Sequence, residues 1–231
     1  MIKKVKTQGL CNEVYKIEKN NKEFILRFFK KAHSVKIDRK QEFKIQTLAY
    51  KKKLASKPIY LDKDLKFMTC EFLAGKHKKN LSKKQIKILA RSLKKLHGIK
   101  YKKKPYSLKK EFLNYKNYLK DKKSKKLIKN SIDILKKNDK KKDFVLSHND
   151  LNKENIIFNN RVFFIDWEFA SKNNRFFDLA TISIKFKLNK KEEKLLLSTY
   201  FSILEKKQKK KLKKFKIICK NYWKLWFKAN F

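Results

Sequence analysis

The chain has 231 residues, which suits one compact unit or two small lobes built on a hydrophobic core. Its 66 basic and 21 acidic residues give a formal charge of +45, which ordinarily points to nucleic acid or an anionic membrane. Only five of the basic residues are arginines and the lysines are spread along the whole chain, so the composition favours a solvated lysine surface over a specific nucleic-acid reader.

Residues 1 to about 74 are predicted to form a small antiparallel sheet with one helix. Asp38, followed by Gln41, resembles a capping box that opens a helix running through Ala49. The strand-like segments are rich in aromatic and β-branched residues and lie at 14–17, 23–29, 58–60 and 65–72.

After Gly75 the pattern becomes helical. Ser82 and Gln85 form a second capping-box pattern, and Gly98 stands where that helix ends. Between them, apolar residues recur every three or four positions, at Ile86, Leu89, Leu93 and Leu96. Further helical segments are predicted at 108–137, 190–205 and 209–228, and two short strands at 144–146 and 162–165. The predicted fold class is α+β, divided into residues 1–74 and 75–231.

Three cysteines, Cys11, Cys70 and Cys219, lie far apart and form no C-x-x-C pair, so neither a disulfide framework nor a zinc site is predicted. No apolar run approaches the roughly 18 residues that a membrane span needs, and the N-terminus lacks the apolar block of a signal peptide. We therefore expect a cytoplasmic protein without a transmembrane segment. The sequence does not indicate its oligomeric state.

The segment from Phe144 to Asp178 carries the most informative polar residues. His148, Asp150 and Asn155 form the pattern H-x-D-x-x-x-x-N, and an apolar strand then leads to Asp166. This order and spacing match the catalytic loop and metal-binding aspartate of the protein-kinase-like superfamily.

Phosphoryl transfer needs a carboxylate near the attacking hydroxyl and hard oxygen ligands that hold magnesium against the nucleotide phosphates. Asp150 can supply the carboxylate, Asn155 and Asp166 can supply the ligands, and His148 can hold the loop through hydrogen bonds. The alternative is a polar hairpin between two edge strands, in which Asp and Asn serve as turn residues. The combination of His148, two apolar strands and Asp166 favours the phosphoryl-transfer site.

Arg27 lies on the strand face that carries Ile25 and Phe29, so its charge is expected to be partly buried and to need an anionic partner. Glu42 on the first predicted helix is the natural candidate. In a kinase such a pair positions the basic group over the α- and β-phosphates. The alternative is a surface arginine that extends to solvent beside an unrelated glutamate. Gly9 begins a turn that could cover phosphates, although a plain hairpin turn explains it equally well.

The last predicted helix carries an apolar stripe and two tryptophans. Trp223 and Trp226 are three residues apart and occupy neighbouring positions on one face. Indole rings beside an acidic residue suit a quaternary ammonium, because cation–π attraction is strongest with tryptophan. From spacing alone, an ordinary aromatic core stripe is as well supported. The stripe consists of Leu212, Phe215, Cys219, Tyr222 and Trp226.

Several motifs together resemble the choline/ethanolamine kinase family, in particular the bacterial LicA-type choline kinases, within the aminoglycoside phosphotransferase and protein-kinase-like superfamily. The specific pieces are LSHNDLNKEN and FFIDWEFASKN, and supporting pieces are GLCNEVYKI with ILRFF, DRKQE, CEFLAG, FFDLA and YWKLW. The resemblance covers nearly the whole chain. It implies a two-lobed fold with a nucleotide-binding lobe at residues 1–74 and a catalytic, substrate-binding lobe at 75–231.

The resemblance also implies roles for individual residues. Asp150 would be the catalytic base and contact the acceptor, Asn155 and Asp166 would be Mg²⁺ ligands, and Asp178 would tie down the catalytic loop together with His148.

The remaining implied roles concern the two substrates. ATP would lie against Gly9, Asn12, Arg27, Glu42 and a hinge over 68–73 that includes Glu71 and Leu73. Choline would lie against Glu168 and the two tryptophans, Trp223 and Trp226.

The implied activity is transfer of the γ-phosphoryl group of Mg-ATP to choline. Ethanolamine is the nearest alternative acceptor, and an aminoglycoside or sugar is a more distant one. The absence of a V-A-I-K lysine, a G-x-G-x-x-G loop and an A-P-E segment argues against a protein kinase. The competing class is a basic nucleic-acid-binding protein, which only the charge supports.

Overall fold

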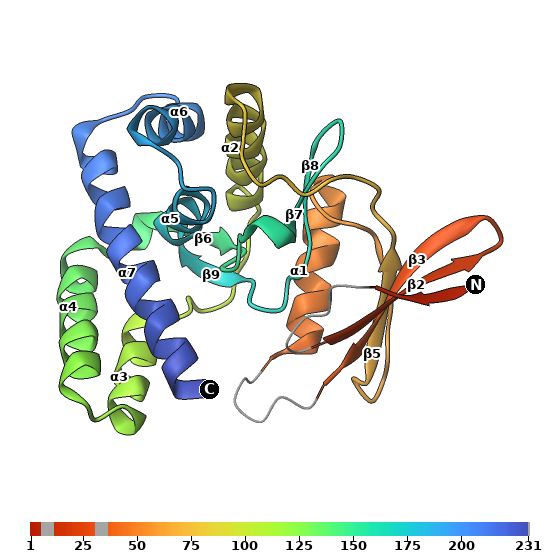
Figure 1. The fold of residues 1–231 in the computed structure, drawn as a ribbon, viewed down its shortest axis with the longest axis horizontal. Helices are drawn as coiled ribbons and strands as arrows, with labels where there is room; N and C mark the ends of the chain where they lie inside the picture. The colour runs from red at the N-terminus through yellow and green to blue at the C-terminus, as the bar shows by residue number, and fades with distance from the viewer. Residues whose placement is uncertain (6–11, 31–36, 231) are drawn as a thin grey trace. The chain divides into compact units, whose positions relative to one another are not determined.

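The computed structural model describes residues 1–5, 12–30 and 37–230. The chain divides into two compact units (Figure 1). Unit 1 comprises Met1–Lys78 and Glu154–Phe169, and unit 2 comprises Lys79–Lys153 and Ala170–Phe231. The antiparallel sheet and the helices confirm the predicted α+β class. The predicted boundary after residue 74 stays a prediction.

Unit 1 contains a five-stranded antiparallel sheet in the order β1-β2-β3-β5-β4. Its strands are β1 (Ile2–Lys4), β2 (Asn12–Lys19), β3 (Lys22–Phe29), β4 (Pro58–Leu61) and β5 (Phe67–Glu71). Because β3 is the middle strand, Arg27 is paired on both sides, with Val14 of β2 and Met68 of β5. The central position of β3 agrees with its aromatic and β-branched composition.

Helix α1 (Arg39–Lys51) begins at the predicted cap, because the Asp38 side chain accepts a hydrogen bond from the backbone N–H of Gln41 at 2.8 Å. The helix buries Ile45 and Ala49 completely. It contacts β4. These contacts place the buried face of α1 in the core of unit 1.

A short hairpin of β7 (Ile156–Phe158) and β8 (Val162–Phe164) completes unit 1. Phe158 also forms a bridge with Lys76, next to Gly75. A Cβ atom at Gly75 would lie 2.4 Å from a methyl carbon of Ile157 and 2.9 Å from the carbonyl oxygen of Phe158. Only glycine therefore allows this close approach of two backbones.

Unit 2 is mainly helical, and its packing joins α2 to α6 and both α4 and α5 to α7. The N-cap of α2 is the predicted capping box of Ser82 and Gln85, and Gly98 is its C-cap. The four apolar residues predicted to share one face of α2 are all fully buried. The helices are α2 (Lys83–His97), α3 (Leu108–Tyr118), α4 (Lys122–Asn138), α5 (Arg175–Lys185), α6 (Lys190–Phe201) and α7 (Lys206–Asn230).

The strand β6 (Phe144–Ser147) of unit 2 pairs with β9 (Ser171–Asn174). The sequence pattern did not predict β9, because its residues SKNN are polar and the pairing with β6 specifies the strand. It also did not predict β7 or α5. Most of α5, from Phe176 to Ser183, is buried, so the helix belongs to the core of unit 2.

Short 3₁₀ turns at Lys141–Asp143 and Lys153–Asn155 precede β6 and β7. Within the described part of the chain, no helix combines the length and the apolar character that crossing a bilayer requires.

Candidate functional site

Arg27 of β3 and Glu42 of α1 form a buried ion pair in unit 1. The Nη1 atom of Arg27 lies 2.6 Å from Oε1 of Glu42, and the two residues are 7% and 1% exposed. Burial alone would lower the pKa of Arg27, but the carboxylates of Glu42, Asp166 and Glu168 together raise it above its ordinary value. The predicted pair is therefore present, with a permanently charged guanidinium. Its placement over nucleotide phosphates stays a prediction.

The second branch of the Arg27 fork reaches the segment that follows β8. Nη2 of Arg27 lies 2.7 Å from Oδ1 of Asp166 and 3.7 Å from Oε2 of Glu168. Asp166 has a φ of 65°, which is the left-handed region that residues other than glycine rarely occupy. Such conformations concentrate at functional sites, where the surrounding contacts hold them.

Asn155 and Asp166, the two predicted metal ligands, come from opposite ends of the β7–β8 hairpin. The carbonyl oxygen of Asn155 accepts a hydrogen bond from the N–H of Ile165 at 3.0 Å, so the hairpin brings the two residues near each other within unit 1. One carries an amide oxygen and the other a carboxylate. These are the hard donors that Mg²⁺ prefers, and magnesium usually completes its shell with water and phosphate oxygens. The residues present therefore fit the ion.

The described residues contain no group of three or more His, Cys, Asp or Glu side chains placed to hold a metal. The roles of Asn155 and Asp166 as ligands stay predictions.

Arg39, the first residue of α1, belongs to the same network although the sequence patterns did not single it out. Its Nη1 atom lies 2.7 Å from Oε2 of Glu42 and 3.1 Å from Oε2 of Glu168. Its guanidinium lies 3.9 Å from the ring centroid of Phe29. A usable signal was the scarcity of arginine in this lysine-rich chain, since a guanidinium can pair with carboxylates while its plane stacks on an aromatic ring.

Glu168 receives three polar contacts inside unit 1. In addition to the two arginines, Nδ2 of Asn12 donates a hydrogen bond to its Oε2 atom at 3.0 Å. Burial and the nearby charge of Asp166 raise the pKa of Glu168 to about 7, against the opposing effects of Arg27 and Asn12. The structure thus gives Asn12 a contact with Glu168, whereas its predicted role toward ATP and the role of Glu168 toward an amino alcohol stay predictions.

In unit 2, the loop that carries Asp150 is anchored by Asp178 of α5. The fully buried carboxylate of Asp178 accepts hydrogen bonds from the backbone N–H groups of His148 and Asn149, each at 2.8 Å. Asn149 has a φ of 68°, so the anchored backbone is in a left-handed conformation immediately before Asp150. The contacts expected for a structural Asp178 are present, and His148 takes part through its backbone. The catalytic role of Asp150 stays a prediction.

His97, at the end of α2, completes the support of Asp178 and was missed from the sequence. Its Nε2 atom lies 3.0 Å from Oδ2 of Asp178, and its Nδ1 atom lies 2.7 Å from the hydroxyl of Tyr200. Burial lowers the pKa of His97, although the hydrogen bond to Asp178 opposes this effect. A neutral ring that donates from Nε2 to the carboxylate and accepts the Tyr200 hydroxyl at Nδ1 satisfies both contacts. A lone histidine beside a leucine stripe gave no sequence signal of this role.

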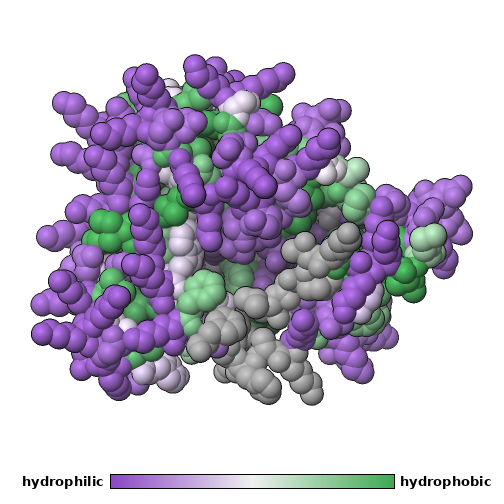
Figure 2. Space-filling model, in the orientation of Figure 1, coloured by the Kyte–Doolittle hydropathy of each residue, from purple (hydrophilic) through white to green (hydrophobic). Residues whose placement is uncertain are grey.

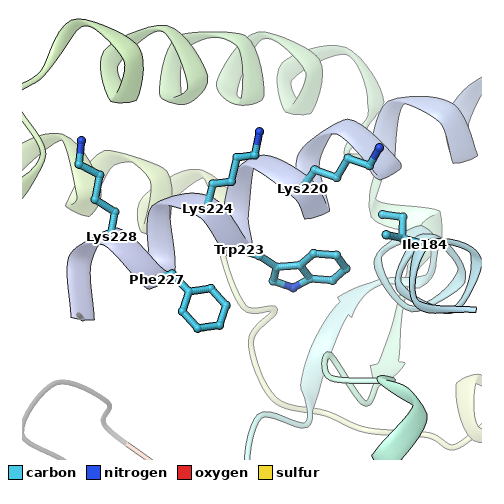
Figure 3. A pocket seen from close by; sticks show the side chains of 6 residues that line it. All are labelled: Ile184, Lys220, Trp223, Lys224, Phe227 and Lys228. Carbon is cyan, nitrogen blue, oxygen red and sulfur yellow. The ribbon is translucent and has the colours of Figure 1, made fainter. Parts of the chain in front are cut away.

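The two tryptophans of α7 have different surroundings. Trp223 lines a hollow of about 620 Å³ on unit 2 with Phe227 and Ile184 (Figure 3). The ammonium of Lys185 lies 4.5 Å from the Trp223 ring centroid. Trp226 is not among the lining residues, and its ring meets that of Phe227 edge-on at 5.2 Å. The substrate cage formed by the two rings stays a prediction.

The predicted inward stripe of α7 is fully buried only in its first part. Leu212, Phe215 and Cys219 have at most 1% exposure, whereas Tyr222 and Trp226 are half-buried. Near the aromatic end, the buried face of α7 continues instead through Asn221 and Leu225, which are 6% and 1% exposed.

The predicted nucleotide-hinge residues follow the sheet of unit 1. Glu71 ends β5 and is exposed, and Leu73 lies two residues later and is half-buried. Gly9 lies outside the described residues. The predicted contacts of all three with ATP stay predictions.

Comparison with known proteins places the chain among phosphotransferases. Residues 7–193 match the model of the phosphotransferase enzyme family. Protein LicA of Haemophilus influenzae is 39% identical over 99 residues, which cover 38% of this chain and 29% of that relative, so the match spans less than a third of the curated protein.

Solved structures share the fold at low sequence identity. Choline kinase LicA from Streptococcus pneumoniae superposes with a TM-score of 0.81 at 21% identity, over 98% of this chain and 84% of that chain. A choline/ethanolamine kinase family protein from Mesorhizobium loti gives 0.79 at 19% identity, over 96% and 78%. These similarities confirm the predicted kinase-like fold. The family model matches more than half of this chain, so the chain belongs to the phosphotransferase enzyme family.

Proposed function

We propose that the protein is an ATP-dependent choline kinase that transfers the γ-phosphoryl group of Mg-ATP to the hydroxyl of choline, giving phosphocholine and ADP. The observation that carries this proposal is that each unit holds one of the predicted catalytic segments in a fixed conformation. Unit 1 holds Asp166 in a left-handed conformation beside the Arg27–Glu42 pair. Unit 2 anchors the Asp150 loop on a buried carboxylate. Similarity to proteins named LicA and to choline kinases supports the choice of acceptor.

In this proposal, Asp150 orients the choline hydroxyl and accepts its proton as the oxygen attacks the γ-phosphorus. The new O–P bond forms while the bond from the γ-phosphorus to the β–γ bridging oxygen breaks, so ADP leaves with that electron pair. Asn155 and Asp166 would hold magnesium, which when bound neutralises charge on the phosphate oxygens. Arg27 would place its positive charge near the α- and β-phosphates of the nucleotide. This chemistry requires Asp150 and the two ligands to meet at one triphosphate.

The proposal assigns the nucleotide to residues 1–74 and the acceptor to residues 75–231. Asn12, Glu71, Leu73 and the turn at Gly9 would contact ATP. Glu168, Trp223 and Trp226 would contact the acceptor, because aromatic faces and a carboxylate suit a cation that has no N–H donors. A cytoplasmic location, where ATP is available, is part of the same proposal.

A coupled assay of ADP release tests the proposal with choline, ethanolamine, an aminoglycoside and no acceptor. We expect release to depend on choline and to fall by about 10²- to 10⁴-fold in Asp150→Asn, which is the usual contribution of a general base. The melting temperature of the variant should stay close to that of the wild type. ADP release without any acceptor, or an active Asp150→Asn protein, contradicts the proposal. Preference for ethanolamine or an aminoglycoside would correct the acceptor alone.

Nucleic-acid binding is the competing hypothesis, because the chain carries a charge of +45. Figure 2 shows hydrophilic residues spread over most of the visible face. Specific binding would be tight at physiological salt, and its logarithm would fall steeply with the logarithm of salt concentration. Weak binding at low salt alone does not distinguish the two hypotheses, because any cationic protein shows it.

A further inference from the structure

The Trp223 ring already binds a cation that belongs to the protein. Lys185, the last residue of α5, places its ammonium 4.5 Å from the ring centroid of Trp223 on α7. This distance lies within the range of about 6 Å over which cation–π attraction operates. Lys185 is half-buried. Within residues 1–5, 12–30 and 37–230, no carboxylate forms an ion pair with it, so the indole is its charge-stabilising contact in the described structure.

The lysines that line the hollow beside Trp223 extend from the other side of α7, away from the Trp223 ring (Figure 3). The hollow beside the ring is lined by Ile184, Phe227 and three lysines, and none of its lining residues is acidic (Figure 3). Lys228 is offset by Asp121 at 2.6 Å, whereas Lys220 and Lys224 are exposed. A substrate cation that approached this ring would find no carboxylate among the residues that line the hollow.

We propose that Lys185 competes with the cationic head of the acceptor for Trp223 and thereby determines acceptor specificity. The inference rests on the proposed kinase function, because it assigns Trp223 to the acceptor site. One indole attracts a second cation less strongly on either face, since the first cation polarises the ring and repels the newcomer. An amino alcohol must therefore displace the Lys185 ammonium from the ring or bind with reduced affinity. Lys185 is a specificity-determining residue in this view, and it takes no part in the chemistry.

Removing the charge of Lys185 tests the competition. Lys185→Met keeps most of the apolar stem but leaves the Trp223 ring without a cation. We expect the KM for choline to fall about 3- to 10-fold with kcat little changed, which corresponds to a cation–π contact of ordinary strength. Lys220→Met is the matched control, because Lys220 lines the hollow beside Trp223, whereas the cation over the ring in the described part of the chain is Lys185. Its KM should change by less than about twofold.

A double-variant cycle assigns the effect to the ring. The gain from Lys185→Met should disappear when Trp223 is replaced by alanine, because the two residues then no longer share an interaction. A KM that is unchanged or raised in Lys185→Met, or a gain that persists in Trp223→Ala, overturns the proposal. An equal gain in Lys220→Met also overturns it, since general charge reduction would then be the cause.

A binding experiment separates this inference from the kinase proposal. Tryptophan fluorescence of the full chain is titrated with tetramethylammonium, which binds through the cation alone. Tighter binding to Lys185→Met than to wild type supports the competition even if no acceptor elicits ADP release, in which case the kinase proposal fails by itself. Equal affinity for the two proteins contradicts the competition even if choline is the substrate.

Discussion

Unit 1 and unit 2 bury charge in different ways. Unit 1 gathers two arginines and three carboxylates into one network, in which each side chain has at least one partner of opposite charge. Unit 2 buries the carboxylate of Asp178 among neutral donors, namely two backbone N–H groups and the ring of His97.

The difference shows two ways to hold a polar segment in place. Opposite charges hold together residues that are far apart in sequence, such as Arg27 and Asp166. Removing one partner is costly, because it leaves the other charge buried without compensation. Hydrogen bonds to a carboxylate fix the local backbone of one loop, and losing them affects mainly that loop. The predictions below separate these two situations.

Arg27→Met should have the largest effect on stability. It removes the only residue that contacts Glu42, Asp166 and Glu168 together among the described residues, and breaking a buried ion pair typically costs about 3–5 kcal/mol. Because Arg39 still holds Glu42, we expect a loss of about 3 kcal/mol in the free energy of unfolding, measured by urea denaturation.

The control for Arg27→Met is Lys66→Met, which breaks the exposed pair with Asp64, where the side chains are 74% and 71% exposed. That change should cost less than about 1 kcal/mol. If both variants lose the same small amount of unfolding free energy, the buried network does not stabilise unit 1.

Asp178→Asn should have the next largest effect. The amide keeps the shape of the side chain but removes the negative charge of the carboxylate, whose oxygens accept hydrogen bonds from the N–H groups of His148 and Asn149. Hydrogen bonds to charged groups contribute about 1.5–3 kcal/mol to stability. Amide hydrogen exchange at these two positions should accelerate, and kcat should fall with the displacement of Asp150. The exposed Asp133→Asn is the matched control. Unchanged protection at His148 and Asn149 would show that Asp178 does not anchor the loop.

Arg39→Lys should have a smaller effect. An ammonium keeps the positive charge beside Glu42 and Glu168 but has no planar group to stack on Phe29. We expect a loss of about 1 kcal/mol in unfolding free energy, and a larger loss in Arg39→Gln. Equal stability of Arg39→Lys and the wild type would show that stacking on Phe29 contributes nothing to the stability of unit 1.

The part of the pH dependence of stability that arises from His97 in unit 2 should be the smallest effect. Because burial lowers the pKa of His97 from its ordinary value of 6.5, the unfolded chain binds a proton that the folded protein does not as the pH falls through that value. The His97 contribution is therefore fully present above 6.5 and is lost progressively below it. Unfolding measured between pH 5 and 8 should show this loss, and His97→Gln should remove it. A variant with the wild-type pH profile would contradict the assignment.

Local patterns predicted several elements well because their signals are local. The capping residues and apolar period of α2 lie within one helix, and the composition of β3 suits a central strand. The Arg27–Glu42 pair was also predictable, since a charge on an apolar strand face needs a partner. By contrast, β9 and α5 were missed: β9 is polar and takes its structure from pairing with β6, and α5 is buried on nearly all sides.

The residues of the candidate site also fall into two groups, those that the sequence indicated and those that it did not. Spacing in the sequence indicated Asp150, Asn155 and Asp166, because loop and strand lengths are short-range features. It could not reveal Arg39, His97 or Lys185, since each acts through a partner on another element: Glu168, Asp178 and Trp223 respectively.

By itself, the sequence determined the α+β class, the main helices and the family. Only the tertiary structure decided which charges are buried together and which cation occupies the Trp223 ring. The physical reason is that the energy of a charge depends on the distance and burial of its partners, and folding sets both quantities between residues that are remote in the chain.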